Sequence, residues 1–162
     1  MTLKLHSKRI YDSKNRLIYE LHHDHDEYIN KYDDNDNLIY SKNTNLISGE
    51  LGYEFSQEFD SHGNLIHKVN IGYGVDDIFE YEPGSDIVKN ISSDKDGSLT
   101  QYIKKSDIVI DKIEKQTEDK TVDLLGHVSL YEYDNHGNVS KIIDLDEDGS
   151  PCLEIDYENI YE

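Results

Sequence analysis

The chain has 162 residues, a length typical of one domain, and its 35 acidic and 16 basic residues give a formal net charge of −19. Such a charge disfavours nucleic acids and anionic membranes as partners and favours basic proteins or cations. Charged residues make up 31% of the chain, but its 13 tyrosines and frequent β-branched residues suit half-buried sheets. We therefore expect one folded, strand-rich domain over residues 1–162.

The N-terminal residues MTLKLHSKRIYD enter strand-like alternation directly, without an apolar signal segment. No later run approaches transmembrane length, and Cys152 is the single cysteine, so no internal disulfide can form. These features together predict a cytoplasmic protein.

A degenerate repeat organises the chain, in which an aromatic residue is followed six positions later by Leu, Ile or Val. Clear copies begin at Tyr11, Tyr32, Phe59 and Tyr133, looser copies begin at Tyr81 and Tyr102, and a last strand without a partner is expected at Tyr157. Each copy predicts a β-hairpin, because period-two alternation flanks a cluster of Asn, Asp and Gly. In the copy at Tyr133, Gly137 and Asn138 are expected to supply the positive φ that a tight turn needs.

Second turns, such as Asp94–Ser98 and Asp146–Ser150, separate the hairpins. The fold is thus predicted to be all-β, an antiparallel meander of about twelve or thirteen strands. Because open sheets rarely exceed about ten strands without curling, we expect a strongly curved sheet or half-barrel. Between Ser106 and Lys120 a short helix is an alternative, although the β-branched residues at 108–110 favour a strand.

The pattern aromatic-Asp-x-x-Gly-Asn-Leu, clearest in Phe59–Leu65 and Tyr133–Val139, resembles the YD repeat of bacterial Rhs and teneurin-type proteins. The resemblance covers nearly the whole chain and implies β-hairpins. Large YD proteins build a hollow shell from scores of repeats, whereas this chain has about seven copies. The function of the shell therefore does not carry over.

Two segments resemble metal sites. The run His22-His23-Asp24-His25-Asp26 lacks the further ligands of a tetrahedral set, so a polar hairpin turn is the simpler interpretation. Residues 144–149 imitate the start of an EF-hand loop, but Ile155 stands where the bidentate Glu is needed, so we interpret them as a β-turn and expect no cofactor.

Acidic residues alternate with the aromatic residues along several strands and are expected to share one face of the sheet. The candidates for a partner-binding surface are Glu54, Glu58, Glu80, Glu82, Glu132, Glu154, Asp156 and Glu158. Neighbouring acids would repel across strands by about 0.2–1 kcal/mol each. This face is either a solvated surface or a docking surface for a basic partner.

No nucleophile, phosphate-loop or dinucleotide motif is present, so the chain is not expected to be an enzyme. Its resemblance to YD repeats of toxin systems and its acidity imply an immunity protein that neutralises a cognate basic toxin domain, such as a nuclease, in the bacterial cytoplasm. The alternative is a non-enzymatic YD-repeat module with a structural or ligand-binding role. A carbohydrate- or calcium-binding sheet is a third, weaker hypothesis.

Overall fold

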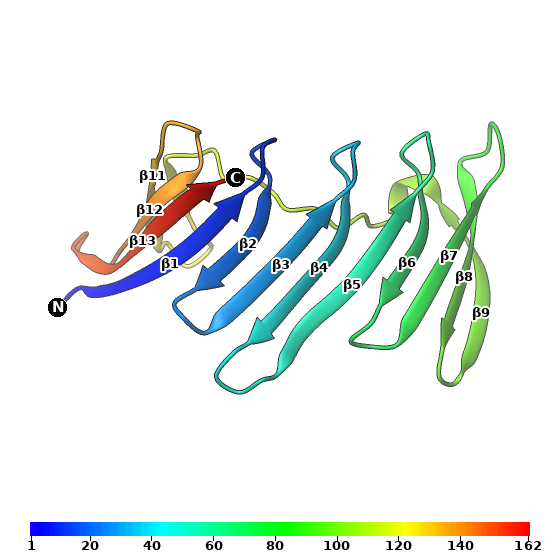
Figure 1. The fold of residues 1–162 in the computed structure, drawn as a ribbon, viewed down its shortest axis with the longest axis horizontal. Helices are drawn as coiled ribbons and strands as arrows, with labels where there is room; N and C mark the ends of the chain where they lie inside the picture. Colours follow the sequence, from blue (N-terminus) through cyan, green and yellow to red (C-terminus); the bar gives the residue numbers. More distant parts are fainter. The chain divides into compact units, whose positions relative to one another are not determined.

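The computed structural model describes all residues from 1 to 162, as thirteen strands and one short 3-10 helix (Figure 1). The strands are β1 (Leu3–Tyr11), β2 (Leu17–His22), β3 (Asp26–Tyr32), β4 (Leu38–Asn45), β5 (Leu51–Phe59), β6 (Leu65–Asn70), β7 (Val75–Tyr81), β8 (Ile87–Asp94), β9 (Gly97–Lys104), β10 (Lys120–Val122), β11 (Val128–Tyr133), β12 (Val139–Leu145) and β13 (Pro151–Tyr161). The 3-10 helix η1 covers Lys105–Asp107. No helix is long and apolar enough to span a membrane.

The strands form a single sheet in the order β10-β11-β12-β13-β1-β2-β3-β4-β5-β6-β7-β8-β9. The all-β prediction is confirmed. The sheet is open, with β10 and β9 as its edge strands, and so does not close into a barrel. Its strong curvature stays a prediction.

The expected simple meander is wrong at the last strand. β13 pairs antiparallel with β12 and parallel with β1, in a register that runs from Leu3 opposite Leu153 to Tyr11 opposite Tyr161. Tyr157 therefore lies on a strand paired along both edges, and the edge expected there does not exist. Alternation of side chains identifies a strand but does not determine which strand lies beside it.

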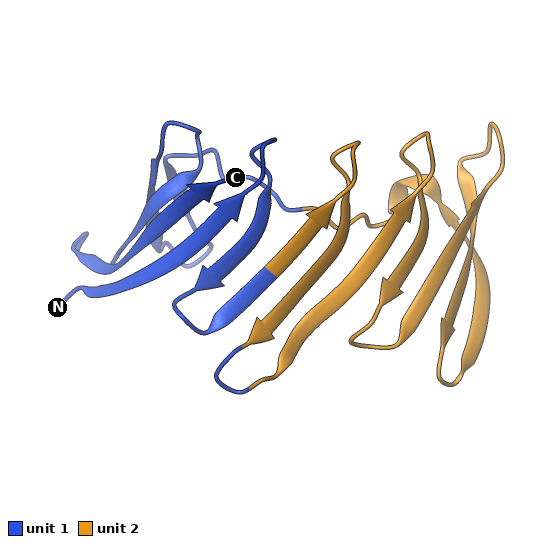
Figure 2. Ribbon diagram, in the orientation of Figure 1, with its two compact units in different colours: residues 1–28, 46–48, 113–162 blue, residues 29–45, 49–112 orange.

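The chain divides into two compact units (Figure 2). Unit 1 comprises residues 1–28, 46–48 and 113–162, and unit 2 comprises residues 29–45 and 49–112. In unit 1, Val139, Ile155 and Tyr157 form a buried cluster. In unit 2 the buried apolar residues Leu38, Leu65 and Val88 share the interior with buried polar residues, namely Asn30, Ser41, Gln57 and Asn90. That the two units form one domain stays a prediction.

Turns of one recurring type explain most of the hairpins. In each turn, Oδ1 of an aspartate accepts hydrogen bonds from the backbone N–H groups two and four positions later, and the residue three positions later has positive φ. The aspartates of these turns are Asp12, Asp33, Asp60, Asp123, Asp134 and Asp146. A carboxylate can bridge N–H groups in this way because the turn is too tight for strand partners to satisfy them. The EF-hand-like segment is thus a turn of this type, as we interpreted it.

Three details of the predicted repeat are corrected. Gly137 has positive φ, 72°, but Asn138 does not, because its place in the turn is one residue later. The turn at Asp123 was not expected, since its Leu124 and Leu125 disguise it. The copy at Tyr102 is not a hairpin, because β9 ends at Lys104 and η1 follows.

The connection between η1 and β10 is neither the strand that we favoured nor the alternative helix. Residues 108–118 have no regular secondary structure. The backbone of Asp111 bonds instead to the buried side chain of Gln57, through N–H to Oε1 at 2.9 Å and C=O to Nε2 at 3.0 Å. Val109, which was expected to favour a strand, is 71% exposed and lies outside the strands.

Candidate functional site

The predicted acidic residues fall into two groups. Glu54 and Glu58 on β5, Glu80 on β7 and Glu82 just after it belong to unit 2. Glu132 on β11 and Glu154, Asp156 and Glu158 on β13 belong to unit 1. In each group the acids come from two strands that flank a third, β6 in unit 2 and β12 in unit 1. In unit 1, β13 also lies directly beside β1.

The sheet register places a base opposite each acid of the unit 1 group. The cross-strand pairs are Lys4 with Glu154, His6 and Lys141 with Asp156, Lys8 with Glu158, and Lys141 with Glu132. Nζ of Lys4 lies 3.1 Å and Nζ of Lys141 lies 3.3 Å from Oε2 of Glu154. These hydrogen bonds lower the pKa of Glu154. We call the surface formed by these paired residues the charged face; they are Lys4, His6, Lys8, Glu132, Lys141, Glu154, Asp156 and Glu158.

Three of the four acids of unit 2 have similar partners, and the fourth, Glu82, follows the end of β7. Nζ of Lys89 lies 2.8 Å from Glu80, and His67 lies opposite Glu58 with its Nδ1 at 3.5 Å. Glu54 lies opposite Lys42 and accepts the Tyr40 hydroxyl at 2.7 Å, and burial together with this bond raises the pKa of Tyr40 to about 12. The cross-strand repulsion that we expected is therefore wrong for the seven of these acids that lie on strands, because each has a base opposite it or in contact with it.

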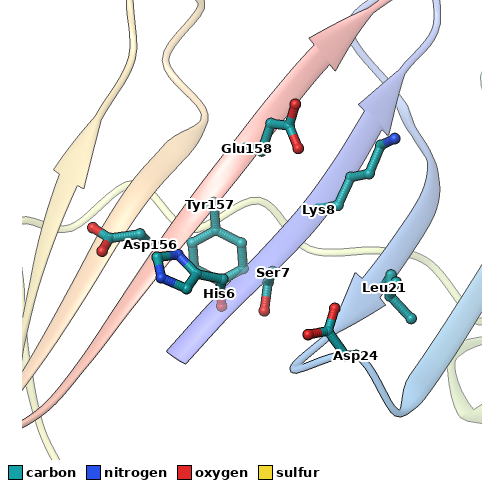
Figure 3. Close-up of a pocket in the computed structure, with 8 residues that line it drawn as sticks. All are labelled: His6, Ser7, Lys8, Leu21, Asp24, Asp156, Tyr157 and Glu158. Atoms are coloured by element: carbon teal, nitrogen blue, oxygen red, sulfur yellow. The ribbon is translucent and has the colours of Figure 1, made fainter. Parts of the chain in front are cut away.

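A pocket of about 460 Å³ opens beside the charged face of unit 1 (Figure 3). Its lining residues are His6, Ser7 and Lys8 of β1, Leu21 of β2, Asp24 from the turn after β2, and Asp156, Tyr157 and Glu158 of β13. Figure 3 shows the β13 residues running alongside those of β1, with Leu21 and Asp24 on the other side of β1. The parallel β1–β13 pairing, which the sequence did not reveal, thus builds the pocket.

The charge of the pocket is not balanced. Three carboxylates, those of Asp24, Asp156 and Glu158, border it together with a single lysine, Lys8. Leu21 adds an apolar wall. An extended cationic side chain fits such a lining, because its apolar stem can lie against leucine while its head meets carboxylates.

In the sequence, Asp24 stands out only as part of the histidine run. His23 and Asp24 both have positive φ, 53° and 62°, and form the turn between β2 and β3, which confirms the polar-turn interpretation. Nδ1 of His22 and Nδ1 of His23 each lie 3.4 Å from the buried Oγ of Ser7. No group of three or more His, Cys, Asp or Glu side chains is arranged to hold a metal ion.

The opposite face of unit 1 is aromatic, as expected, but it also carries an ion pair that the sequence did not suggest. Arg9 Nη2 lies 3.0 Å from Glu20 Oε1, and the guanidinium lies 3.8 Å from the centre of the Tyr157 ring. Burial favours the neutral form of Glu20, but bonds from His22 and Arg9 outweigh it and lower the pKa of Glu20. The two side chains are 17% and 12% exposed, so the pair packs largely within this face.

Comparisons with known proteins add little. No family model matches the sequence, and no curated protein matches it. Among solved structures, the chain resembles part of a Tc holotoxin pore from Photorhabdus luminescens, with a TM-score of 0.37 and 11% identity. The match covers 91% of this chain and 11% of that chain.

Proposed function

We propose that this chain is a non-enzymatic binding protein that neutralises a basic protein through the charged face of unit 1. The observation that carries the proposal is the pocket, whose lining includes three acidic residues and Leu21 but only one lysine, Lys8. An arginine or lysine of the partner would enter this pocket. Asp156 and Glu158 would bind its head group.

The partner that we propose is a cognate bacterial toxin domain, which would make this chain an immunity protein acting in the cytoplasm. The YD-like repeat and the net charge of −19 support this choice. Long-range attraction steers an acidic protein toward a basic active site, which the bound protein can then block. The acids of unit 2, Glu54, Glu58, Glu80 and Glu82, would add to the steering.

The second candidate is a structural YD-repeat module on a strongly curved sheet. The contacts of Glu154 favour it, since this carboxylate is already satisfied by Lys4 and Lys141. A face whose charges are matched within the chain needs no partner to be stable. The two candidates differ in whether the pocket acids bind a partner in addition to the bases that lie opposite them.

The decisive experiment co-expresses the chain with the protein encoded by the adjacent gene and measures growth and binding. Protection from a toxic neighbour, with tight binding that weakens as salt rises, is the expected result. Asp156→Asn with Glu158→Gln should weaken binding at least about tenfold, or about 1.4 kcal/mol. The matched control, Asp96→Asn with Glu147→Gln, removes the same charge outside the pocket and should leave affinity nearly unchanged.

Equal losses in both double variants would show that net charge, and not the pocket, attracts the partner. Absence of any toxin whose lethality the chain relieves would refute the immunity role and favour the structural module.

A further inference from the structure

The free edge of β9 is the most exposed strand surface of the chain. In Figure 1, β9 is the last strand of unit 2, and it pairs only with β8. Leu99 is 62% and Tyr102 is 71% exposed. The two strands pair without a register shift from Ile87 opposite Lys104 to Asp94 opposite Gly97.

The hydrogen-bonding groups that β9 leaves open follow from its register. Lys105 N–H donates to Asp86 O at 2.7 Å, so odd-numbered residues of β9 exchange bonds with β8. The N–H and C=O groups of the even-numbered residues point away from β8; these residues are Ser98, Thr100, Tyr102 and Lys104. Such a row of groups is a template for another strand.

The usual protection of an edge is missing from β9. Proteins guard edge strands with proline, bulges, charges or short length. β9 has eight residues and no proline or bulge, and its single charged residue is Lys104 at its end. The opposite edge strand, β10, has three residues, Lys120–Val122, and is protected by its length. The lack of protection is thus specific to β9.

We propose that β9 pairs with β9 of a second copy of this chain, antiparallel about a twofold axis at Gln101. In this register Ser98 faces Lys104 and Thr100 faces Tyr102 of the other copy, so all four outward residues gain backbone partners. Leu99 would lie opposite Ile103, which matches the two apolar side chains on one face of the joined sheet. Shifting the axis to Thr100 would leave Lys104 beyond the paired residues.

Charge also favours a second copy as the occupant. β9 carries no acid in a chain of net charge −19, so the two copies would meet where repulsion is weakest. In this arrangement Lys104 of each copy lies near the start of β9 of the other copy. Asp94 and Asp96 lie there, in and beside the turn between β8 and β9. The patch is therefore complementary to itself, as a twofold interface requires.

The test measures the mass of the full chain by sedimentation over a range of concentrations. We expect a reversible dimer that tightens as salt rises, because salt screens the repulsion between two acidic copies. Leu99→Lys and Thr100→Pro should each weaken it at least about tenfold, and Thr100→Pro removes an outward N–H without breaking the β8 ladder. Val109→Lys, at an exposed site outside β9, is the matched control and should leave the dimer intact.

Disulfide trapping tests the register in a Cys152→Ser background. Gln101→Cys should cross-link two copies, because the residues at the axis form a close non-hydrogen-bonded pair. Circular dichroism confirms that each variant is folded. A chain that stays monomeric at all concentrations, an equal effect of Leu99→Lys and Val109→Lys, or preferential cross-linking through Thr100→Cys would overturn the proposal. Binding of a toxin through Asp156 and Glu158 is independent of these outcomes.

Discussion

Replacing Asp134 by alanine tests how far the turn aspartates hold separate strands together. Besides the N–H groups of its own turn, this carboxylate accepts hydrogen bonds on Oδ2 from Asn159 Nδ2, at 2.8 Å, and from the Tyr161 hydroxyl. Both partners lie on β13. The turn is therefore anchored to the strand that joins β12 to β1.

The expected loss follows from these contacts. The two turn N–H groups bond to Asp134 within a local turn, and we assign the loss of each bond about 0.5 kcal/mol, the low end of the usual range. The bonds from Asn159 and Tyr161 involve a charged acceptor in a half-buried position and contribute about 1.5 kcal/mol each. Asp134→Ala should lower the free energy of unfolding by about 4 kcal/mol, measured by urea denaturation followed by circular dichroism.

Asp60→Ala is the matched control, because Asp60 caps the same type of turn with bonds only to His62 and Asn64. It should destabilise the chain clearly less than Asp134→Ala. Asp134→Asn keeps Oδ1 but replaces Oδ2 by an amide that cannot accept from Asn159, so its loss should be intermediate. Equal losses for the two alanine variants would refute the role of the bonds to β13.

The pH dependence gives a second readout for Asp134. Burial raises the pKa of this carboxyl, but the hydrogen bonds from Tyr161, Asn138 and Asn159 outweigh burial and lower it below the ordinary value. A lowered folded-state pKa stabilises the fold above the unfolded value, about 3.9, and that stability is lost as pH falls through the folded pKa. The advantage of the native chain over Asp134→Asn should therefore shrink below about pH 4.

Two further predictions concern unit 2. Gln57→Ala should lower the free energy of unfolding by about 2–4 kcal/mol, because it removes the hydrogen bonds of the Gln57 side chain to the buried carbonyl of Leu38 and to the backbone of Asp111. The backbone N–H of Asp111 should also exchange its hydrogen faster in this variant. Burial lowers the pKa of His67, but bonds to Asp76 and Glu58 outweigh burial and raise that pKa. His67→Gln should therefore remove stability that is present below about pH 6.5 and is lost as pH rises through the folded pKa. Thermal melts at pH 5–8 measure this, and a constant difference between the two proteins across that range would contradict the prediction.

The sequence predicted the hairpins because their turns are local. Each turn is specified within one short segment. In the turn at Asp60, for example, Gly63 has positive φ three positions later, and the buried Leu65 follows two positions after that. The pairing of β13 with β1 is different, since Leu3 and Leu153 are far apart in the chain. The alternating pattern is the same in both strands and does not select the partner. The bases of β1 do complement the acids of β13 in charge, but this match is visible only once the register is known.

Only the part of the candidate site that depends on local sequence could be predicted. Alternation correctly placed Glu154, Asp156 and Glu158 on one face of one strand. It could not show that Lys4, His6 and Lys8 lie opposite them, because that depends on the register of two distant strands. The pocket, which needs both strands and Asp24, was therefore beyond the reach of the sequence.

The matched charges of this face allow a last prediction that separates the two proposed functions. Lys141 lies opposite Asp156 and Glu132, and its Nζ also contacts Glu154. Lys141→Met would remove the base that these three carboxylates share, while keeping an apolar stem of similar length. Glu154 would keep Lys4, and Asp156 would still lie opposite His6. The mutual repulsion of the three carboxylates should then make the fold slightly less stable, whichever function is correct.

If the face binds a basic partner, Lys141→Met should also speed association several-fold at low salt, because the released acids strengthen the attraction. Stopped-flow mixing at two salt concentrations measures this rate. Lys95→Met, in the exposed turn between β8 and β9, removes the same charge elsewhere and should change the rate far less. If the chain is a structural module, Lys141→Met should change stability alone, since no basic partner would then bind the acids around Lys141.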